Sequence, residues 1–323
     1  MCGGNLCTSY VPSYSKVKIL TINQPWHQRI GHQRDWIWRG WQIRYSYLRR
    51  EYCGTESQHF PIIFVHGFGA SIEHWRNNIP AIAKRHHVYA LDLLGFGASR
   101  KADVEYSAAL WTEQLHDFWQ TIVGSPAILV GNSIGSLVCL NTSAAYPEMV
   151  KGLVMLSLPD VSVREDMLPP VVRPLVTTLE NLVASPLLIK NILRVVRKPN
   201  IIRRWAGLAY PNKAAVTDEL VEILSSPAYD DGSEQTLFRL SRSVRKAGFA
   251  QSVKDLLPQV KIPMLLIWGQ QDKMIPPNQA KAIAALNSLV RLVELENAGH
   301  CPHDEHPDLF NSLLLDWLES IDS

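Results

Sequence analysis

The stretch Pro126-Ala-Ile-Leu-Val-Gly-Asn-Ser-Ile-Gly135 decides the fold class, because it joins an apolar run to a G-x-S-x-G turn. The apolar run predicts a short buried strand, and the residues after the turn predict a helix. Such a turn is so sharp that the neighbours of the serine must be small, and it exposes the hydroxyl at the end of a sheet. The helix N-terminus adds backbone N–H groups beside that hydroxyl. Ser133 is therefore the candidate nucleophile; the alternative is a glycine-flanked turn with an idle serine.

Short apolar runs recur along the chain with helical stretches between them, for example over residues 106–123 and 136–146. Continuous apolar strands that alternate with helices predict a mostly parallel central sheet covered on both faces, which is an α/β fold. In such sheets the functional residues lie at the carboxyl ends of the strands. The other predicted strands cover residues 61–65, 88–93, 150–156, 263–268 and 291–295.

The chain divides into an irregular N-terminal segment, a core and an insertion. Residues 1–35 show no clear period, and residues 36–47 alternate bulky and polar side chains, which predicts a hairpin with Gly40 near its turn. Residues 159–257 break the strand rhythm and read as helices interrupted by prolines. We expect residues 36–158 and 258–323 to form the core and residues 159–257 to form a helical cap over it.

A serine hydroxyl needs a base to become a nucleophile. His300 comes first after the last predicted strand, in Glu296-Asn-Ala-Gly-His300, and Gly299 allows a tight turn that projects it over the sheet. His303 and His306 compete for the role because they follow closely.

The histidine in turn needs a carboxylate to orient it. Asp272 follows the fifth predicted strand, in Gly269-Gln-Gln-Asp272, and is the preferred candidate. Asp160, after the fourth strand, is the rival. Asp92 lies between two apolar residues before Gly95-Phe-Gly97, and we expect it to brace that glycine turn instead.

Hydrolysis through a serine also needs two N–H donors aimed at the developing oxyanion. The backbone N–H of Ile134 follows the nucleophile directly. The backbone N–H of Phe68, in His66-Gly-Phe-Gly69, is the second candidate, because the flanking glycines let that loop come close. The alternative is that residues 66–69 are only a loop.

Composition restricts the class of protein further. The 323 residues carry a net charge of +2, with 46% hydrophobic and 19% charged residues, which is typical of a globular protein and gives no reason to expect nucleic-acid binding. The five cysteines are odd in number and lack C-x-x-C spacing, so we expect neither a zinc site nor disulfides, and a reducing, cytoplasmic compartment. Cys139 reads as a small buried residue. We expect no cofactor, no signal peptide and no membrane-spanning helix.

Taken together, several motifs resemble the α/β-hydrolase superfamily over about residues 36–320. They are His66-Gly-Phe-Gly69, Asp92-Leu-Leu-Gly-Phe-Gly-Ala-Ser99, Gly131-Asn-Ser-Ile-Gly135, Gly269-Gln-Gln-Asp272 and Gly299-His300. The resemblance implies the α/β-hydrolase fold. Nucleophile, acid and base also occur in the order known for that fold, as Ser133, Asp272 and His300.

More narrowly, the chain resembles the pheophytinases and chlorophyll dephytylases of photosynthetic organisms. The resembling segments include residues 66–76 and Gly-His-Cys-Pro-His-Asp-Glu305, whereas Ser136 stands where pheophytinases usually carry glycine. The implied reaction is cleavage of a large apolar ester, the phytyl ester of a chlorophyll-type tetrapyrrole. Gly-Asn-Ser also occurs in hydrolases that cleave carbon–carbon bonds of ring-fission products, and a slow-turnover binding protein is a third alternative. Ser133 argues against dehalogenase and epoxide-hydrolase chemistry, which need aspartate there.

The cap sequence around residues 182–204 combines large apolar residues with basic ones and contains no acidic residue. This pattern is typical of a helix that lies at the surface of an anionic membrane. We therefore expect a cytoplasmic protein that can bind peripherally to a membrane such as the thylakoid membrane. Alternatively, the apolar residues face the catalytic sheet and the basic ones form a solvated face. The basic residues are Lys190, Arg194, Arg197, Lys198, Arg203 and Arg204.

Overall fold

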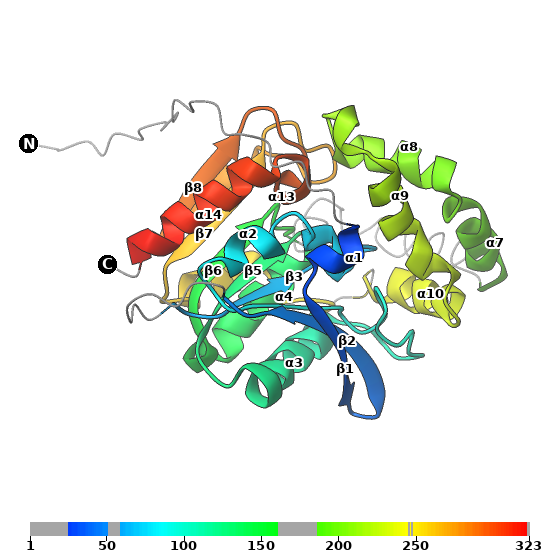
Figure 1. Ribbon diagram of the computed structural model, residues 1–323, viewed down its shortest axis with the longest axis horizontal. Coiled ribbons are helices and arrows are strands. Elements are labelled where there is room, and N and C mark those ends of the chain that lie inside the picture. Colours follow the sequence, from blue (N-terminus) through cyan, green and yellow to red (C-terminus); the bar gives the residue numbers. More distant parts are fainter. Residues whose placement is uncertain (1–24, 51–58, 161–185, 245, 247, 322–323) are drawn as a thin grey trace, which may run out of the picture.

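The computed structural model describes residues 25–50, 59–160, 186–244, 246 and 248–321. Eight strands form one sheet in the order β1-β2-β4-β3-β5-β6-β7-β8, with helices on both of its faces (Figure 1). Strands β3 to β8 pair in parallel, and β2 joins β1 and β4 antiparallel. All six strands predicted from apolar runs are present. The strands are β1 (His32–Trp38), β2 (Trp41–Leu48), β3 (Ile62–Val65), β4 (Val88–Leu91), β5 (Ala127–Asn132), β6 (Val150–Leu156), β7 (Met264–Gly269) and β8 (Val290–Leu295).

Burial on both faces explains why the central strands β3, β5 and β7 are almost entirely apolar. Alternate residues of β3 point to opposite sides, so that Ile63 and Val65 belong to one core cluster and Ile62 and Phe64 to the other. Helices α3 (Ala108–Phe118) and α4 (Ile134–Ala145) cover the first cluster, whereas α2 (Ile79–Ala83) and α14 (Pro307–Ile321) cover the second. The sheet is therefore the middle layer of three.

The helices predicted over residues 106–123 and 136–146 correspond to α3, which continues as a π-turn to Val123, and to α4. Ser107 caps α3 by accepting the Leu110 N–H. The remaining core helices are α1 (Trp26–Arg29), α11 (Val253–Leu256), α12 (Gln279–Ala284) and α13 (Pro302–Glu305), with 3-10 turns at Ile72–Trp75, Pro147–Met149 and Leu257–Gln259.

The predicted hairpin is formed by β1 and β2, and it begins at His32, earlier than the sequence pattern suggested. Its turn is Arg39-Gly40, and both residues have positive φ angles, 50° and 84°. The aromatic residues of the hairpin pack on the core, as expected: the rings of Trp36 and Tyr45 both meet Phe118 edge-on.

Between β6 and β7 the chain leaves the sheet, and the described residues 186–257 contain helices and turns but no strand. The first four of these helices lie together at one side of the molecule (Figure 1). They are α7 (Pro186–Val196), α8 (Pro199–Ala209), α9 (Asp218–Ser225) and α10 (Ser233–Ser243), with 3-10 turns at Lys213–Ala215 and Ser226–Tyr229. We refer to α7–α10 as the cap; the predicted boundaries at 159 and 257 stay predictions.

Candidate active site

Ser133 occupies the turn between β5 and α4 with a strained backbone, at φ 54° and ψ −119°. Two glycines make this turn feasible. A Cβ added at Gly131 would overlap the backbone of Gly135, and one added at Gly135 would overlap the carbonyl oxygen of Val65. The Ser133 N–H donates to the carbonyl oxygen of Leu156 at 2.8 Å, which fixes the turn against β6. This is the strand-turn-helix geometry that presents a serine hydroxyl at the end of a sheet.

Ser136, which departs from the pheophytinase pattern, has a structural role. Its hydroxyl is fully buried and lies 2.7 Å from the carbonyl oxygen of Gly131 and 2.9 Å from that of Leu156, to which it can donate. It also accepts the Leu156 N–H at 2.9 Å. A glycine here would leave these strand-end groups to find other partners, so the serine braces the turn from behind.

His300 and Asp272 form a hydrogen-bonded pair, with Nδ1 of the histidine 2.9 Å from Oδ2 of the carboxylate. Asp272 follows β7, and His300 follows β8. The other carboxylate oxygen of Asp272 accepts the N–H groups of Met274 and Ile275 at 2.8 and 2.9 Å. Burial alone would raise the pKa of Asp272, but the hydrogen bond and charge of His300 outweigh it and the pKa is lowered. An ionised carboxylate at Nδ1–H leaves Nε2 of the imidazole able to accept a proton.

The two competing histidines lie in other surroundings. His303 is fully buried against the ring of Trp75, and no described residue hydrogen-bonds to either of its ring nitrogens. Burial and the neighbouring His74 hold its pKa well below the ordinary value. His306 has Nε2 2.7 Å from the carbonyl oxygen of Asn297. The structure therefore brings His300 to Asp272, and places the rival acid Asp160 four residues beyond β6.

Three loops converge around Ser133. Asn132, its neighbour, donates from Nδ2 to the carbonyl oxygen of His300 at 3.1 Å across a separation of 168 residues. A Cβ added at Gly67, in the loop after β3, would lie 3.5 Å from the Ser133 Cβ. The candidate nucleophile, the base and the predicted oxyanion loop thus meet at one end of the sheet.

The predicted oxyanion donors flank this meeting point. Ile134 opens α4, where an N–H group has no acceptor within its own helix. Phe68 follows Gly67, and its ring is half exposed and contacts Phe96 edge-on. Their donor roles stay predictions.

His66 fixes the loop that carries Phe68. It accepts the Leu93 N–H at Nε2, at 3.1 Å, so its proton resides on Nδ1, which lies 2.7 Å from the carbonyl oxygen of Gly67. Burial lowers the pKa of His66 to about 4, which keeps it neutral. His66 is thus a spacer between two strand ends.

Asp92 braces its own turn, as expected. Its carboxylate accepts the N–H groups of Ala98 at 2.7 Å and Ile72 at 2.8 Å, and a Cβ added at Gly97 would overlap it. Burial raises the pKa of Asp92 to about 6 in spite of these bonds.

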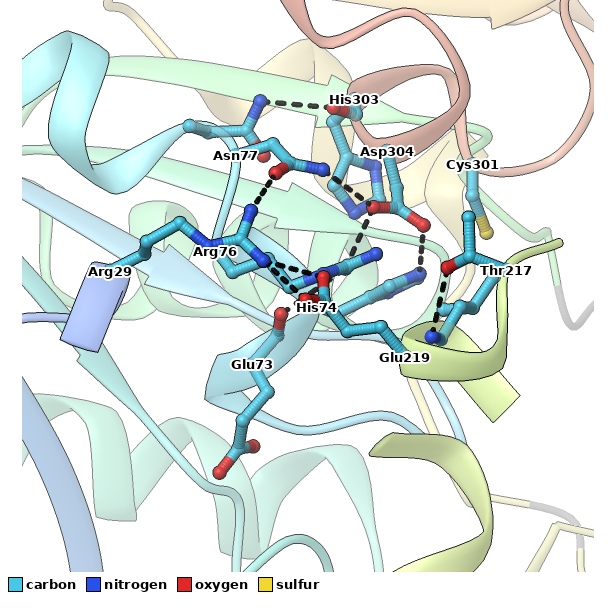
Figure 2. A network of polar contacts seen from close by, with 12 residues as sticks. Arg29, Glu73, His74, Arg76, Asn77, Thr217, Glu219, Cys301, His303 and Asp304 are labelled. Atoms are coloured by element: carbon cyan, nitrogen blue, oxygen red, sulfur yellow. Dashed lines mark hydrogen bonds and ion pairs between the residues drawn. The ribbon is translucent and has the colours of Figure 1, made fainter. Parts of the chain in front are cut away.

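A largely buried polar network that includes Asp304, four residues after His300, was not anticipated from the sequence (Figure 2). Arg76 forms ion pairs with Asp304 at 2.8 Å and with Glu219 at 2.6 Å, and Arg29 pairs with Glu219 at 2.5 Å. The Tyr210 hydroxyl donates to Asp304 at 2.8 Å. Because that hydroxyl gives its proton to Asp304, it accepts one from Nε2 of His74, at 2.6 Å. No sequence signal marks this network, since its members are scattered over five segments.

The network ties the cap to the loop of the candidate base, because Tyr210 and Glu219 belong to the cap and Asp304 to α13. Backbone contacts reinforce it. The His300 N–H donates to the carbonyl oxygen of Ala209 at 2.9 Å. Glu305 accepts the N–H groups of Gly299 and Asn212 at 2.6 Å each. The chain between α8 and α9 therefore clamps the turn that carries the histidine.

The cysteines and acidic residues of the described part show no other centre. Cys139 and Cys301 are buried free thiols, and Cys139 lies in the core, as predicted. Across the described ranges, no group of three or more His, Cys, Asp or Glu side chains could hold a metal ion.

Comparisons with known proteins agree on the fold and differ in chemistry. The 2-hydroxy-6-oxo-6-(2'-aminophenyl)hexa-2,4-dienoic acid hydrolase of Metapseudomonas resinovorans is 27% identical over 80% of this chain and 83% of its own. The chloroplastic pheophytinase of Arabidopsis thaliana is 23% identical over 84% of this chain, which spans 64% of the pheophytinase. The (lyso)-N-acylphosphatidylethanolamine lipase of Mus musculus is 26% identical over 81% of this chain and 80% of its own.

Solved structures extend the comparison. A serine hydrolase involved in carbazole degradation superposes with a TM-score of 0.72 at 23% identity, covering 89% of this chain and 98% of its own. The epoxide hydrolase CorEH has the same TM-score at 16% identity, covering 90% and 99%. Such likeness shows the fold alone, since one fold serves several chemistries. A family model described as the alpha/beta hydrolase fold matches residues 61–307, so the chain belongs to the α/β-hydrolase family.

Proposed function

We propose that the protein is a serine hydrolase that cleaves a carboxylic ester of a large apolar substrate. One observation carries the proposal: the 2.9 Å hydrogen bond between His300 and Asp272, next to the strained turn of Ser133. A histidine oriented by a buried carboxylate beside such a serine is the arrangement that activates the hydroxyl.

In the proposed reaction Nε2 of His300 takes the proton of the Ser133 hydroxyl as its oxygen attacks the ester carbonyl. The N–H groups of Phe68 and Ile134 bind the oxyanion of the tetrahedral intermediate. The imidazolium then protonates the leaving alkoxide, and the alcohol departs from an acyl-serine. Water, deprotonated by the same imidazole, attacks the acyl group; the imidazolium then returns its proton to the Ser133 oxygen as the acid leaves. Asp272 stays ionised throughout.

The loops around the site support an apolar substrate. Phe68 and Met274 are 51% and 52% exposed. Phe68 carries a candidate oxyanion N–H, and Met274 follows the candidate acid, Asp272, by two residues. Large apolar side chains held exposed on site loops gain free energy by covering apolar substrate surface.

We take the phytyl ester of chlorophyll or pheophytin as the first substrate to test, because the Arabidopsis pheophytinase is one of the relatives. A second candidate is hydrolysis of a carbon–carbon bond in a ring-fission dienoate. The relative from Metapseudomonas resinovorans and the 2-hydroxymuconate semialdehyde hydrolase of a Pseudomonas strain, 26% identical over 82% of this chain, favour it.

The experiment is product analysis after incubation of the purified chain with chlorophyll, pheophytin, p-nitrophenyl esters of increasing acyl length and a ring-fission dienoate. Ester hydrolysis that rises with acyl length, with Ser133 labelled by a fluorophosphonate, supports the proposal. Turnover of the dienoate alone selects the second candidate. Labelling of Ser133 without turnover of any substrate points to a hydrolase-fold binding protein and overturns the proposal.

A further inference from the structure

Helices α7 and α8 of the cap carry exposed apolar residues. Trp205 and Leu208 of α8 are 57% and 45% exposed, and Val195 and Ile192 of α7 are 52% and 38% exposed. We call the faces of α7 and α8 that bear these residues the outer cap face. The two helices form the extremity of the molecule in Figure 1. A soluble globular surface rarely gathers large apolar residues without a binding role.

Positive charge surrounds these apolar residues. Neither α7 nor α8 contains an acidic residue, and exposed basic side chains lie beside the apolar ones along both helices. Two of them have anionic neighbours within the cap: Arg194 lies 3.8 Å from Glu234, and Arg203 pairs with Asp218. The exposed basic residues are Arg194, Lys198, Arg203 and Arg204.

We propose that the outer cap face docks on an anionic lipid membrane surface. Large apolar residues bury at the boundary of headgroups and acyl chains, and basic residues beside them are attracted by anionic lipids. No helix of the described residues is long and apolar enough to cross a membrane, so the contact is peripheral. A second copy of this chain fits the face poorly, because a two-fold interface would oppose the same basic residues to one another.

The inner side of the cap suits this role. Buried Arg76 and Arg29 form ion pairs with partly buried Glu219, and buried Tyr210 bonds to buried Asp304, so these contacts hold the cap to the core. The helices of the outer cap face are thus carried on a fixed base, and docking needs no rearrangement of the site. The proposal rests on exposure and charge and is independent of the substrate proposed above.

The test is co-sedimentation of the full chain with vesicles of phosphatidylcholine, with or without phosphatidylglycerol, at low and high salt. The charge variant combines Arg194→Gln, Lys198→Gln and Arg204→Gln. Its matched control combines Lys84→Gln, Lys261→Gln and Arg291→Gln, which remove the same charge from exposed positions outside the cap. A third variant combines Trp205→Ala and Leu208→Ala.

We expect wild type to bind the anionic vesicles at low salt and to release them as salt rises. Each basic residue contributes about fivefold near an anionic surface, so the charge variant should bind about a hundredfold more weakly and the control little differently. The apolar variant should bind about tenfold more weakly at both salt concentrations. All variants should hydrolyse a short soluble ester as wild type does.

Three results would overturn the proposal. The first is no binding of wild type to anionic vesicles at low salt. The second is equal loss of binding in the charge variant and its matched control, which would reveal a general electrostatic effect. The third is a dimer in light scattering that the apolar variant dissociates, which would make the outer cap face an interface between copies.

Discussion

The inner and outer sides of the cap differ in which groups they bury and which they expose. Tyr210 and Trp205 are five residues apart at the end of α8, yet the tyrosine is 2% exposed and the tryptophan 57% exposed. On the inner side the cap buries charged and hydroxyl groups that are paired with the core. Specific polar bonds thus hold the cap to the core, whereas the apolar residues of the outer cap face remain exposed. Substitutions on the two sides should therefore affect different properties.

The largest expected effect is on catalysis, from a substitution at Ser133 in the candidate active site. Ser133→Ala should lower kcat on an ester by about 10⁴-fold or more, because only oxyanion and binding effects remain. Trp205→Ala, on the outer side, should leave kcat on a soluble ester within about twofold. Steady-state kinetics of both variants measure the contrast, and near-normal turnover of Ser133→Ala would refute the nucleophile.

The acid should follow closely. Asp272→Asn should lower kcat by about a thousandfold, because the amide favours the wrong histidine tautomer. Asp160→Asn should lower it far less. Both kcat values come from the same assay, and the reverse ranking would move the acid to the end of β6.

Stability should respond strongly to the ion pairs of the inner side. Arg76→Met leaves Asp304 buried without its main counter-charge, and should lower the free energy of unfolding by about 3–5 kcal/mol. The comparison variant is Arg194→Met, whose partner Glu234 lies 3.8 Å away at the surface, and should cost less than about 1 kcal/mol. Urea unfolding measures both, and equal losses would contradict the distinction between the two sides.

The inner side should also titrate with pH. Burial, partly offset by Asp304, lowers the pKa of His74 to about 4. An unfolded histidine titrates near 6.5, so between these values the unfolded chain binds the extra proton and stability falls as pH decreases. The loss from this one group approaches about 3 kcal/mol at pH 4. His74→Gln should reduce the slope of the unfolding free energy against pH, on the acid side, by the equivalent of about one bound proton. Urea unfolding at a series of pH values measures this slope, and an unchanged slope would show that His74 is not the group.

The smallest expected contrast is in stability, between a substitution at Trp205 in α8 and one at Tyr210, the residue that follows α8. Tyr210→Phe leaves the Nε2–H of His74 without its acceptor and Asp304 without one donor, and should cost about 1–3 kcal/mol. Trp205→Phe should change stability by less than about 0.5 kcal/mol. Thermal melts of both variants test the difference, which vanishes if the tyrosine hydroxyl can be replaced by water.

The fold was accessible from the sequence because its strands are buried on both faces, so apolar runs such as residues 150–156 stand out. The pair of Asp272 and His300 was accessible because each follows a strand directly. The network of Arg76, Tyr210 and Asp304 was not, since its residues come from separate turns and helices and share no spacing. Only folding brings such residues together, and their local patterns resemble those of any polar surface.

The long separation between the serine and its base has a consequence for synthesis. Asn132 and the carbonyl oxygen it binds are 168 residues apart, so a ribosome adding about 5–20 residues per second makes the elbow roughly 10–30 s before the histidine. Until Met264–Gly269 has been made, β6 lacks β7 as a neighbour, and its apolar edge stays open in the nascent chain. In the proposed mechanism Ser133 therefore has no base until His300 has been made, and the last fifth of the chain supplies β7, β8, Asp272 and His300.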